Sequence, residues 1–262
     1  MRPYGSLIRF GLVVPPANAT VEPEIAALMP SGAALHVARL PGAVERDTSR
    51  GLDSRIKGYV AALPDVVRSF GGMELDALCL MHTGCSYVVG IEGEARLREA
   101  LALSGADRTY TVAETIAETL AALGAERIAL VVPYPDWLAE ASVAYWTARG
   151  FSVLDVAKPR DIVSIYEIPP DAVLEAMSRL DRGNVDAILL TGTGMATLGA
   201  LESCSPRSEI PVISANQCAA WEALRPRIAS GMALHPVLHD LRARLGDHSR
   251  AMRTTGRAKT FP

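Results

Sequence analysis

The chain has 262 residues, of which 49% are hydrophobic, 21% charged and 5% aromatic, and its formal net charge is −3. This composition is typical of a packed globular protein and excludes a long disordered or collagen-like chain. A slightly acidic chain lacks the basic surface of a general nucleic-acid binder, so we expect no nucleic-acid partner. No apolar run reaches the ~20 residues of a membrane span, so we expect no membrane partner either.

The N-terminus, MRPYGSLIRFGLVVPP, has the arginine and the apolar run of a signal peptide. However, Arg9 interrupts the run, Pro15 and Pro16 end it, and no small-residue cleavage site follows. We therefore expect a buried first strand and a cytoplasmic protein. The four cysteines form no CxxC pair, so we expect reduced thiols at Cys79, Cys85, Cys204 and Cys218.

Short apolar runs alternate along the chain with longer segments whose apolar residues recur at helical spacing. The predicted strands are 6–14, 35–40, 77–81, 127–132, 151–156 and 187–190. The predicted helices are 21–29, 54–69, 94–103, 111–123, 136–149 and 171–180. This alternation predicts an α/β fold with parallel sheets that helices cover on both faces.

Two pairs of segments repeat in the same order. Residues 76–84 (DALCLMHTG) align without gaps on 186–194 (DAILLTGTG), and 11–15 (GLVVP) align on 129–133 (ALVVP). Both pairs lie roughly 110 to 120 residues apart, which favours an internal duplication. We expect two similar Rossmann-like lobes related by a pseudo-dyad, residues 1–110 and 111–214. Residues 215–238 are expected to pack back onto the first lobe, and 239–262 form an arginine-rich tail.

Four predicted strand ends converge on the cleft between the lobes, the edge where open α/β sheets bind ligands. In the first turn, 15–24, Pro16 stiffens the chain and Asn18 offers an amide donor and acceptor. In the second, 81–86, Thr83 and Ser86 add hydroxyls and Gly84 lets the backbone approach an anion. For the first turn, an ordinary N-capped βα turn is the alternative, so ligand contact by Asn18 and simple capping both stay open there.

The second turn also carries groups that transfer protons. A histidine at this edge, His82, titrates near neutral pH and can move a proton. Cys85 follows near the start of a helix, where a thiolate is stabilised. A structural histidine and a buried helix-start cysteine are the alternatives.

The third and fourth turns offer donors to a negative charge. Tyr134 lies between two prolines, a rigid place for a phenol that donates to an oxyanion, although it can also simply pack on the sheet edge. In 190–195 the glycines Gly192 and Gly194 expose backbone N–H groups, and Thr191 and Thr193 add hydroxyls. This pattern suits a carboxylate or phosphate. It is neither a Walker A loop nor GxGxxG, which argues against a nucleotide-binding domain.

No group of residues has metal-ligand spacing. His235 and His239 are four residues apart, but a third ligand is absent, so we expect no metal. The four turns and the segment 210–217 (IPVISANQ), in this order, resemble the aspartate/glutamate racemase superfamily, in its branch of maleate cis–trans isomerases and arylmalonate decarboxylases. The likeness covers residues 1 to about 230. It implies a site without a cofactor between the two lobes, and a homo-oligomer.

The resemblance also implies roles for single residues. Asn18 matches a position that holds a substrate carboxylate in the isomerases. Thr83 and Tyr134 match hydroxyls that hold a carboxylate or enediolate in the decarboxylases, and Pro15 and Pro16 match that branch's apolar wall. The residues expected to bind substrate are Pro15, Asn18, Thr83, Gly84, Ser86, Tyr134, Asp161, Gly192, Thr193 and Gly194.

The chain departs from the family at the reacting groups. The family has cysteines at one or both of the repeat-related turns, where this chain has His82 and Gly192. Asp161 stands where the isomerases grip the far carboxylate with an asparagine, and it would repel that group. We therefore expect an isomerase or decarboxylase-type lyase acting on a small carboxylate through an enolate-like intermediate, with His82, Cys85 and Tyr134 as catalytic residues. The alternative is a binding or sensing protein that kept the pocket and lost catalysis.

Overall fold

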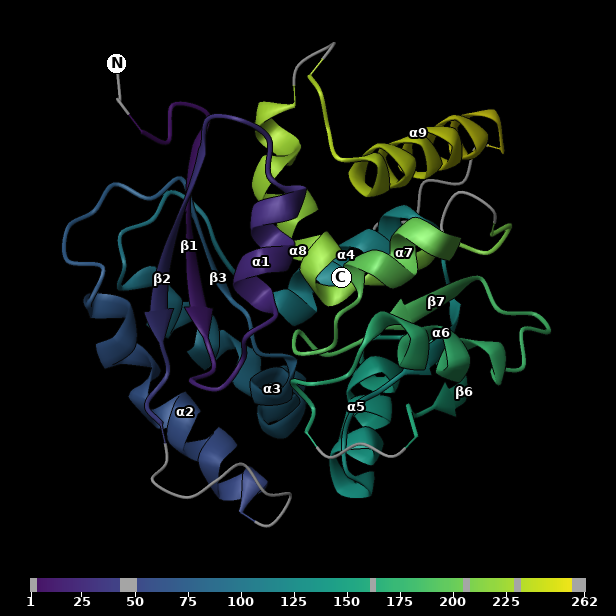
Figure 1. Cartoon of the computed structure of the whole chain (residues 1–262), viewed down its shortest axis with the longest axis horizontal. Helices are drawn as coiled ribbons and strands as arrows, with labels where there is room; N and C mark the ends of the chain where they lie inside the picture. Colours follow the sequence, from purple (N-terminus) through teal and green to yellow (C-terminus); the bar gives the residue numbers. More distant parts are fainter. Residues whose placement is uncertain (1–3, 43–50, 161–163, 205–207, 229–231, 256–262) are drawn as a thin grey trace.

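The computed structural model describes residues 4–42, 51–160, 164–204, 208–228 and 232–255. It contains two four-stranded sheets in which every pairing between strands is parallel (Figure 1). The first has the order β2-β1-β3-β4 and the second the order β6-β5-β7-β8. The strands are β1 (Ile8–Val14), β2 (Ala33–Arg39), β3 (Ala77–Leu80), β4 (Thr109–Thr111), β5 (Arg127–Val131), β6 (Ser152–Ala157), β7 (Ala187–Leu190) and β8 (Val212–Ser214).

Helices connect the strands and cover the sheets. They are α1 (Val21–Leu28), α2 (Leu52–Arg68), α3 (Thr83–Ala102), α4 (Val112–Ala122), α5 (Asp136–Ala148), α6 (Pro170–Ser178), α7 (Leu198–Cys204), α8 (Ala215–Leu224), the 3-10 helix η2 (Arg225–Arg227) and α9 (Pro236–Thr255). The central strands β1, β3, β5 and β7 are almost wholly buried, whereas the edge strands β2 and β6 are half exposed. The predicted α/β fold with two parallel sheets is confirmed, since the core lies between each sheet and its helices.

The repeated sequence segments occupy equivalent places in the two sheets. Asp76 Oδ2 accepts the Arg9 backbone N–H at 2.7 Å, and Asp186 Oδ2 accepts the Arg127 backbone N–H at 2.8 Å. Each carboxylate also pairs with an arginine side chain, Arg227 in the first case and Arg127 in the second. The two aspartates therefore fasten the start of each central strand in the same way.

The two halves contact each other closely. The helix α8, which follows the second sheet, packs against α1 and α4 (Figure 1). Arg108, just before β4, donates to the backbone carbonyls of Glu222 and Ala223 at 2.9 and 2.8 Å. The last helix, α9, covers α7, α4 and α8. Within the described residues, no helix is long and apolar enough to cross a membrane.

Several elements were not predicted or differ in extent. The helices α7, α8 and α9 and the 3-10 helix η2 were not predicted. The strands β4 and β8 were not predicted either, because three residues each are too short for a periodic pattern. The helix α3 begins at Thr83, eleven residues before the predicted start at Glu94. Gly84, Gly90 and Gly93 weaken its helical pattern, and Gly90 has a φ of 65° at a bend in the helix. The segment expected to be a turn is therefore the first turn of α3.

Candidate active site

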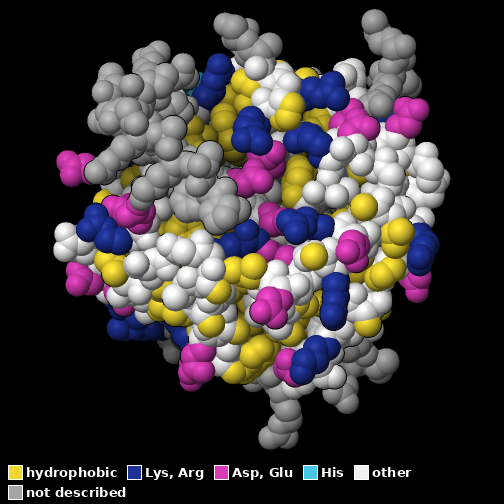
Figure 2. Space-filling view, turned by 180° about the vertical axis from the view of Figure 1, so that it is seen from behind, with side chains coloured by type: hydrophobic (Ala, Val, Ile, Leu, Met, Phe, Trp, Pro, Cys, Tyr) yellow, Lys and Arg dark blue, Asp and Glu magenta, His cyan; other side chains and the backbone are white. Residues whose placement is uncertain are grey.

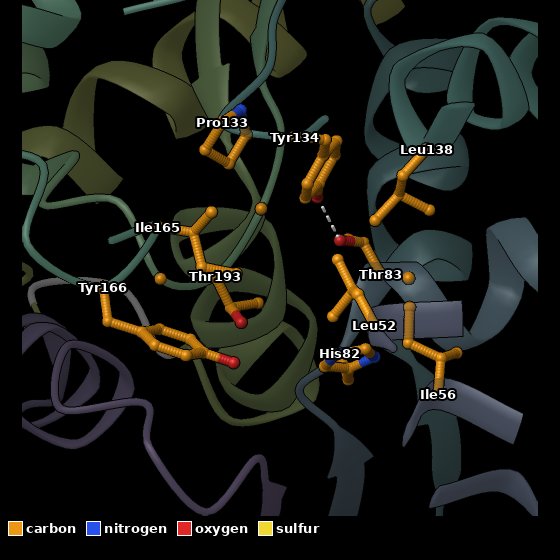
Figure 3. Close-up of a pocket in the computed structure, with 13 residues that line it drawn as sticks. Leu52, Ile56, His82, Thr83, Pro133, Tyr134, Leu138, Ile165, Tyr166 and Thr193 are labelled. Atoms are coloured by element: carbon orange, nitrogen blue, oxygen red, sulfur yellow. Dashed lines mark hydrogen bonds between the residues drawn. The ribbon is translucent and has the colours of Figure 1, made fainter. Parts of the chain in front are cut away.

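A pocket lies where the carboxyl ends of the two sheets face each other (Figure 3). It holds about 380 Å³ of space free of protein atoms, part of which is open to solvent. Its polar lining comes from the turns after β3, β5 and β7 and from the segment before α6: His82, Thr83, Gly84, Tyr134, Gly192, Thr193, Gly194 and Tyr166. Its apolar lining is Leu52, Ile56, Pro133, Leu138 and Ile165.

The polar end of the pocket is a pair of buried hydroxyls. Thr83 Oγ1 and Tyr134 Oη lie 2.6 Å apart, one at the start of α3 and the other in the turn after β5 (Figure 3). Burial raises the pKa of Tyr134 to about 12, so the phenol is neutral at pH 7. One hydroxyl donates to the other, which leaves the acceptor's own proton available to an oxyanion.

A second pair of hydroxyls lies behind the first. Tyr87 Oη is hydrogen-bonded to Thr191 Oγ1, and both residues are buried. The rings of Tyr87 and Tyr134 meet edge to face, with centroids 6.0 Å apart. Packing therefore fixes the phenol of Tyr134 before any ligand arrives, which is the preorganisation that electrostatic stabilisation requires.

His82 is held as a neutral hydrogen-bond donor. It is the N-cap of α3, and its Nδ1 accepts the backbone N–H of Cys85 at 3.0 Å. The rings of Tyr59 and His82 meet edge to face, with centroids 5.5 Å apart, which adds to the apolar surroundings of His82. Burial lowers the pKa of His82 to about 4, so the ring is uncharged at neutral pH. Because Nδ1 is an acceptor, the ring proton is on Nε2.

Gly192 has little room for a side chain. Its φ is +97°, and a Cβ placed there would lie 2.9 Å from both Pro133 Cγ and Tyr134 Oη. The close approach brings the turn after β7 directly against the hydroxyl pair. Both the backbone conformation and the fit of Tyr134 therefore favour a glycine at this position.

Asn18 does not line the pocket, although it was expected to bind substrate. Its Nδ2 donates to Thr193 Oγ1 at 3.0 Å, and its Oδ1 accepts the backbone N–H groups of Thr20 and Val21. Thr193 Oγ1 in turn donates to the Met81 carbonyl oxygen at 2.9 Å. The Asn18 side chain is buried and joins the turns after β1 and β7, so it positions Thr193 from behind the pocket wall.

The remaining expected residues divide between the pocket and its surroundings. Cys85 is 1% exposed, is absent from the lining and has its thiol pKa raised by burial, so a thiolate at the pocket does not fit this geometry. Ser86 and Pro15 are buried and also lie outside the lining. Asp161 lies outside the described residues. Among the described residues, the pocket thus joins His82, Thr83, Gly84, Tyr134, Gly192, Thr193 and Gly194, and not Pro15, Asn18, Cys85 or Ser86.

The sequence analysis did not identify Leu52, Ile56, Ile165 or Tyr166 as residues of the site. Leu52 and Ile56 are four residues apart on α2, a spacing that also describes ordinary core residues. Ile165 and Tyr166 come from a segment without helical or strand periodicity, which gave no signal. Within the parts of the chain that the structure describes, no group of three His, Cys, Asp or Glu side chains is placed to bind a metal ion.

Comparisons by sequence and by fold both show a similarity to maleate isomerases and arylmalonate decarboxylases. The model of a family described as arylmalonate decarboxylase matches residues 10–233. Maleate isomerase of Nocardia farcinica is 32% identical over 231 residues, which is 83% of this chain and 89% of that protein. Arylmalonate decarboxylase of Bordetella bronchiseptica is 27% identical, over 82% of this chain and 88% of that protein.

Among solved structures, one shows a cysteine-to-serine variant of the Nocardia farcinica maleate cis–trans isomerase with a covalently bound succinylcysteine intermediate. It superposes with a TM-score of 0.72 at 29% identity and covers 83% of this chain and 91% of that one. A crystal structure of arylmalonate decarboxylase superposes with a TM-score of 0.69 at 24% identity, covering 88% and 96%. The second likeness concerns the fold alone.

Proposed function

Since the chain belongs to the arylmalonate decarboxylase family, we propose that it is an enzyme that acts on a small carboxylic acid, without a cofactor, through an enolate-like intermediate. The observation that carries this proposal is the buried Thr83–Tyr134 hydroxyl pair, whose oxygens lie 2.6 Å apart in a pocket between two parallel sheets. Neutral donors fixed in a water-poor site stabilise negative charge that develops on a carboxyl group.

The same end of the pocket supplies further donors to a carboxylate. Thr83 and Gly84 are the first residues of α3, and the first N–H groups of a helix have no partner within the helix. The positive end of the helix dipole also favours an anion there. The Nε2–H of His82 completes this set. In this proposal His82 donates a hydrogen bond to the substrate and does not act as a base.

We favour decarboxylation of a malonate-type acid as the reaction. One carboxyl group would accept hydrogen bonds from Thr83 and Tyr134, while the other would meet apolar side chains of the lining, among them Leu52, Ile56 and Ile165. Desolvation disfavours a charge against such side chains. Breaking the bond from the α-carbon to this carboxylate releases CO₂, and the bonding electron pair moves into the retained carboxyl group to form an enediolate. A proton then returns to the α-carbon.

Isomerisation of maleate is the second candidate, because the Nocardia farcinica relative at 32% identity is a maleate isomerase. A homologous isomerase carries a succinyl group on a cysteine. None of the described residues that line this pocket is a cysteine, so a thiol-dependent reaction is less well supported here. The same fact favours a reaction that needs only charge stabilisation and one proton.

Proton NMR in D₂O with phenylmalonate and with maleate, offered separately, tests the proposal. We expect phenylacetate that carries deuterium beside its carboxylate. Tyr134→Phe removes a donor to the enediolate and should lower the rate on the order of 10²-fold. Tyr4→Phe is the matched control, since Tyr4 is 81% exposed, and should keep the wild-type rate.

The outcomes separate the candidates. Fumarate from maleate, with phenylmalonate unchanged, would favour the isomerase. If folded wild-type protein converts neither acid, carbanion chemistry on these acids is ruled out. A rise in melting temperature with the same acids would then favour a binding or sensing protein.

A further inference from the structure

We propose, on the basis of the function proposed above, that Tyr166 is the catalytic residue that delivers the proton to the α-carbon of the substrate. Tyr166 belongs to the segment that leads into α6 and lines the pocket on the side of the second sheet. Its hydroxyl points into the pocket, toward the His82 side, and lies beside Thr193 (Figure 3). No sequence pattern assigned it a role.

The position of the ring is defined by a glycine. A Cβ on Gly194 would lie 2.6 Å from Tyr166 Cδ1 and 3.1 Å from the Ile165 carbonyl oxygen, so the ring packs flush against the turn after β7. The hydrogen bond from the Ala196 backbone N–H to the Ile168 carbonyl oxygen, at 3.2 Å, ties the same segment to that turn. The phenol therefore projects from a wall that the fold itself constrains.

The other proton-bearing groups among the described lining residues have different tasks. Thr83 and Tyr134 hydrogen-bond to each other at the polar end, where they stabilise the negative charge. Thr193 Oγ1 already donates its proton to the Met81 carbonyl oxygen. These three hydroxyls hold charge or structure, and a proton taken from the pair would remove the stabilisation at the moment it is needed.

His82 is a poor proton donor in this setting. Its Nδ1 is occupied by the Cys85 N–H, so the ring is the neutral Nε2–H form, and burial keeps the imidazolium pKa at about 4. Loss of the Nε2 proton would leave an imidazolate, which is a much stronger base than a phenolate. We therefore assign the acid to Tyr166, whose hydroxyl points into the pocket (Figure 3), a role that tyrosine plays in general acid catalysis.

The proton balance closes with water alone. After CO₂ has left, the Tyr166 O–H bond breaks as the C–H bond forms at the α-carbon, and the enediolate becomes a carboxylate. The phenolate then regains a proton from water, since Tyr166 is half-buried at a pocket that opens to solvent. No oxidant or reductant is needed.

Because the proton is delivered from one side of the pocket, a product with a stereocentre should form mainly as one enantiomer. Tyr166 and His82 project from opposite sides of the pocket (Figure 3). We expect wild-type protein to convert 2-methyl-2-phenylmalonate into mainly one enantiomer of 2-phenylpropionate. Tyr166→Phe should give nearly racemic product, because water then protonates either face. With phenylmalonate the variant should lose on the order of 10²-fold in kcat, while KM changes by less than about threefold.

Two controls make the result specific. His82→Asn keeps an N-cap acceptor for α3, and whatever product it forms should retain the wild-type enantiomeric excess. Replacing Tyr166 by 3,5-difluorotyrosine lowers the phenol pKa and should move the alkaline limb of the kcat profile to lower pH, an effect that a merely structural tyrosine would not show.

Retention of both the kcat and the enantiomeric excess by a folded Tyr166→Phe variant would overturn the assignment of Tyr166 and leave the proposed function intact. A racemic product from the wild type would do the same. An inactive wild type would overturn the proposed function and the role of Tyr166 together.

Discussion

At the scale of single residues, the chemistry of the pocket depends on which atom of His82 carries a proton. The Cys85 backbone N–H points at Nδ1, so the ring is tied to the start of α3 as a cap. Burial then disfavours the charged ring. A histidine that reads as a pH-sensitive base in the sequence is in the structure a fixed, neutral donor, because a helix end uses one of its two nitrogens.

This histidine should make the protein sensitive to acid. The pKa of His82 is lowered to about 4 in the folded state from about 6.5 when unfolded, so the unfolded chain binds a proton first as pH falls. Stability from the neutral ring is present above pH ~6.5 and is lost as pH falls toward 4. We expect a loss on the order of 1–3 kcal/mol, since the ring partly faces solvent.

Urea unfolding between pH 7 and 4 measures this loss. The His82→Asn variant retains a capping side chain and does not titrate, so its free energy of unfolding should fall less over this range. If the free energies of unfolding of the two proteins fall in parallel with pH, His82 is protonated equally easily in the folded and the unfolded state.

At the scale of elements, the turn after β7 is shaped to meet the turn after β5. A glycine with φ of +97° brings its backbone to the Tyr134 hydroxyl, where even a methyl group would lie 2.9 Å away. Gly192→Ala should therefore destabilise the fold by more than the ~1 kcal/mol of a positive φ, and should also displace Tyr134 from Thr83 and reduce turnover.

Gly72→Ala is the matched control for this turn. Gly72 has φ of +75°, but nothing lies within 4 Å of a Cβ placed there, so only the backbone cost applies. Thermal unfolding of both variants compares the two positions. An equally small shift in melting temperature for both would mean that Pro133 and Tyr134 move aside without cost.

The elements also show what a sequence discloses about such a site. Thr83 and Tyr134 were found because each directly follows a buried strand, and parallel strands bring their carboxyl ends together. Leu52 and Ile56 were not, because apolar residues four apart on a helix look the same whether they meet a core or a ligand. Tyr166 lies in an irregular segment, whose path depends on contacts with Gly194 that no local pattern encodes.

The start of α3 and the role of Asn18 were missed for related reasons. Three glycines dilute the helical pattern of α3, so its first turn was read as a loop. The sequence places Asn18 at the correct sheet edge, but only the fold shows that its amide is already used by Thr193, Thr20 and Val21. Hydrogen-bond partners distant in the chain are set by tertiary packing.

At the scale of the whole molecule, a buried carboxylate joins the two halves. Glu24 of α1 accepts hydrogen bonds from the Leu198 backbone N–H at 2.7 Å and from Thr197 Oγ1 at 2.9 Å. Asn216 Nδ2 donates to the same carboxylate at 2.7 Å and also to the Thr193 carbonyl oxygen at 3.2 Å. The pocket turn that contains Thr193 is thus held from behind by the first half of the chain.

Removing this carboxylate should be costly. Glu24→Ala leaves several buried donors without an acceptor, so we expect a loss of about 2–4 kcal/mol in the free energy of unfolding. Glu22→Ala is the control two residues away, where a partly exposed carboxylate pairs with Arg39 and contributes about 1 kcal/mol or less. Denaturant unfolding compares the two. Similar small losses would show that water takes over the role of Glu24.

The neutral lining of the pocket has a consequence for how the protein meets its ligand. None of the described lining residues carries a formal charge at pH 7. On the face of the molecule shown in Figure 2, acidic and basic side chains are interspersed. The described lining would therefore add no long-range attraction for an anion, which would be held by hydrogen bonds that surrounding ions scarcely screen. Its affinity would depend on how readily the anion sheds its water, and ionic strength would hardly matter to it.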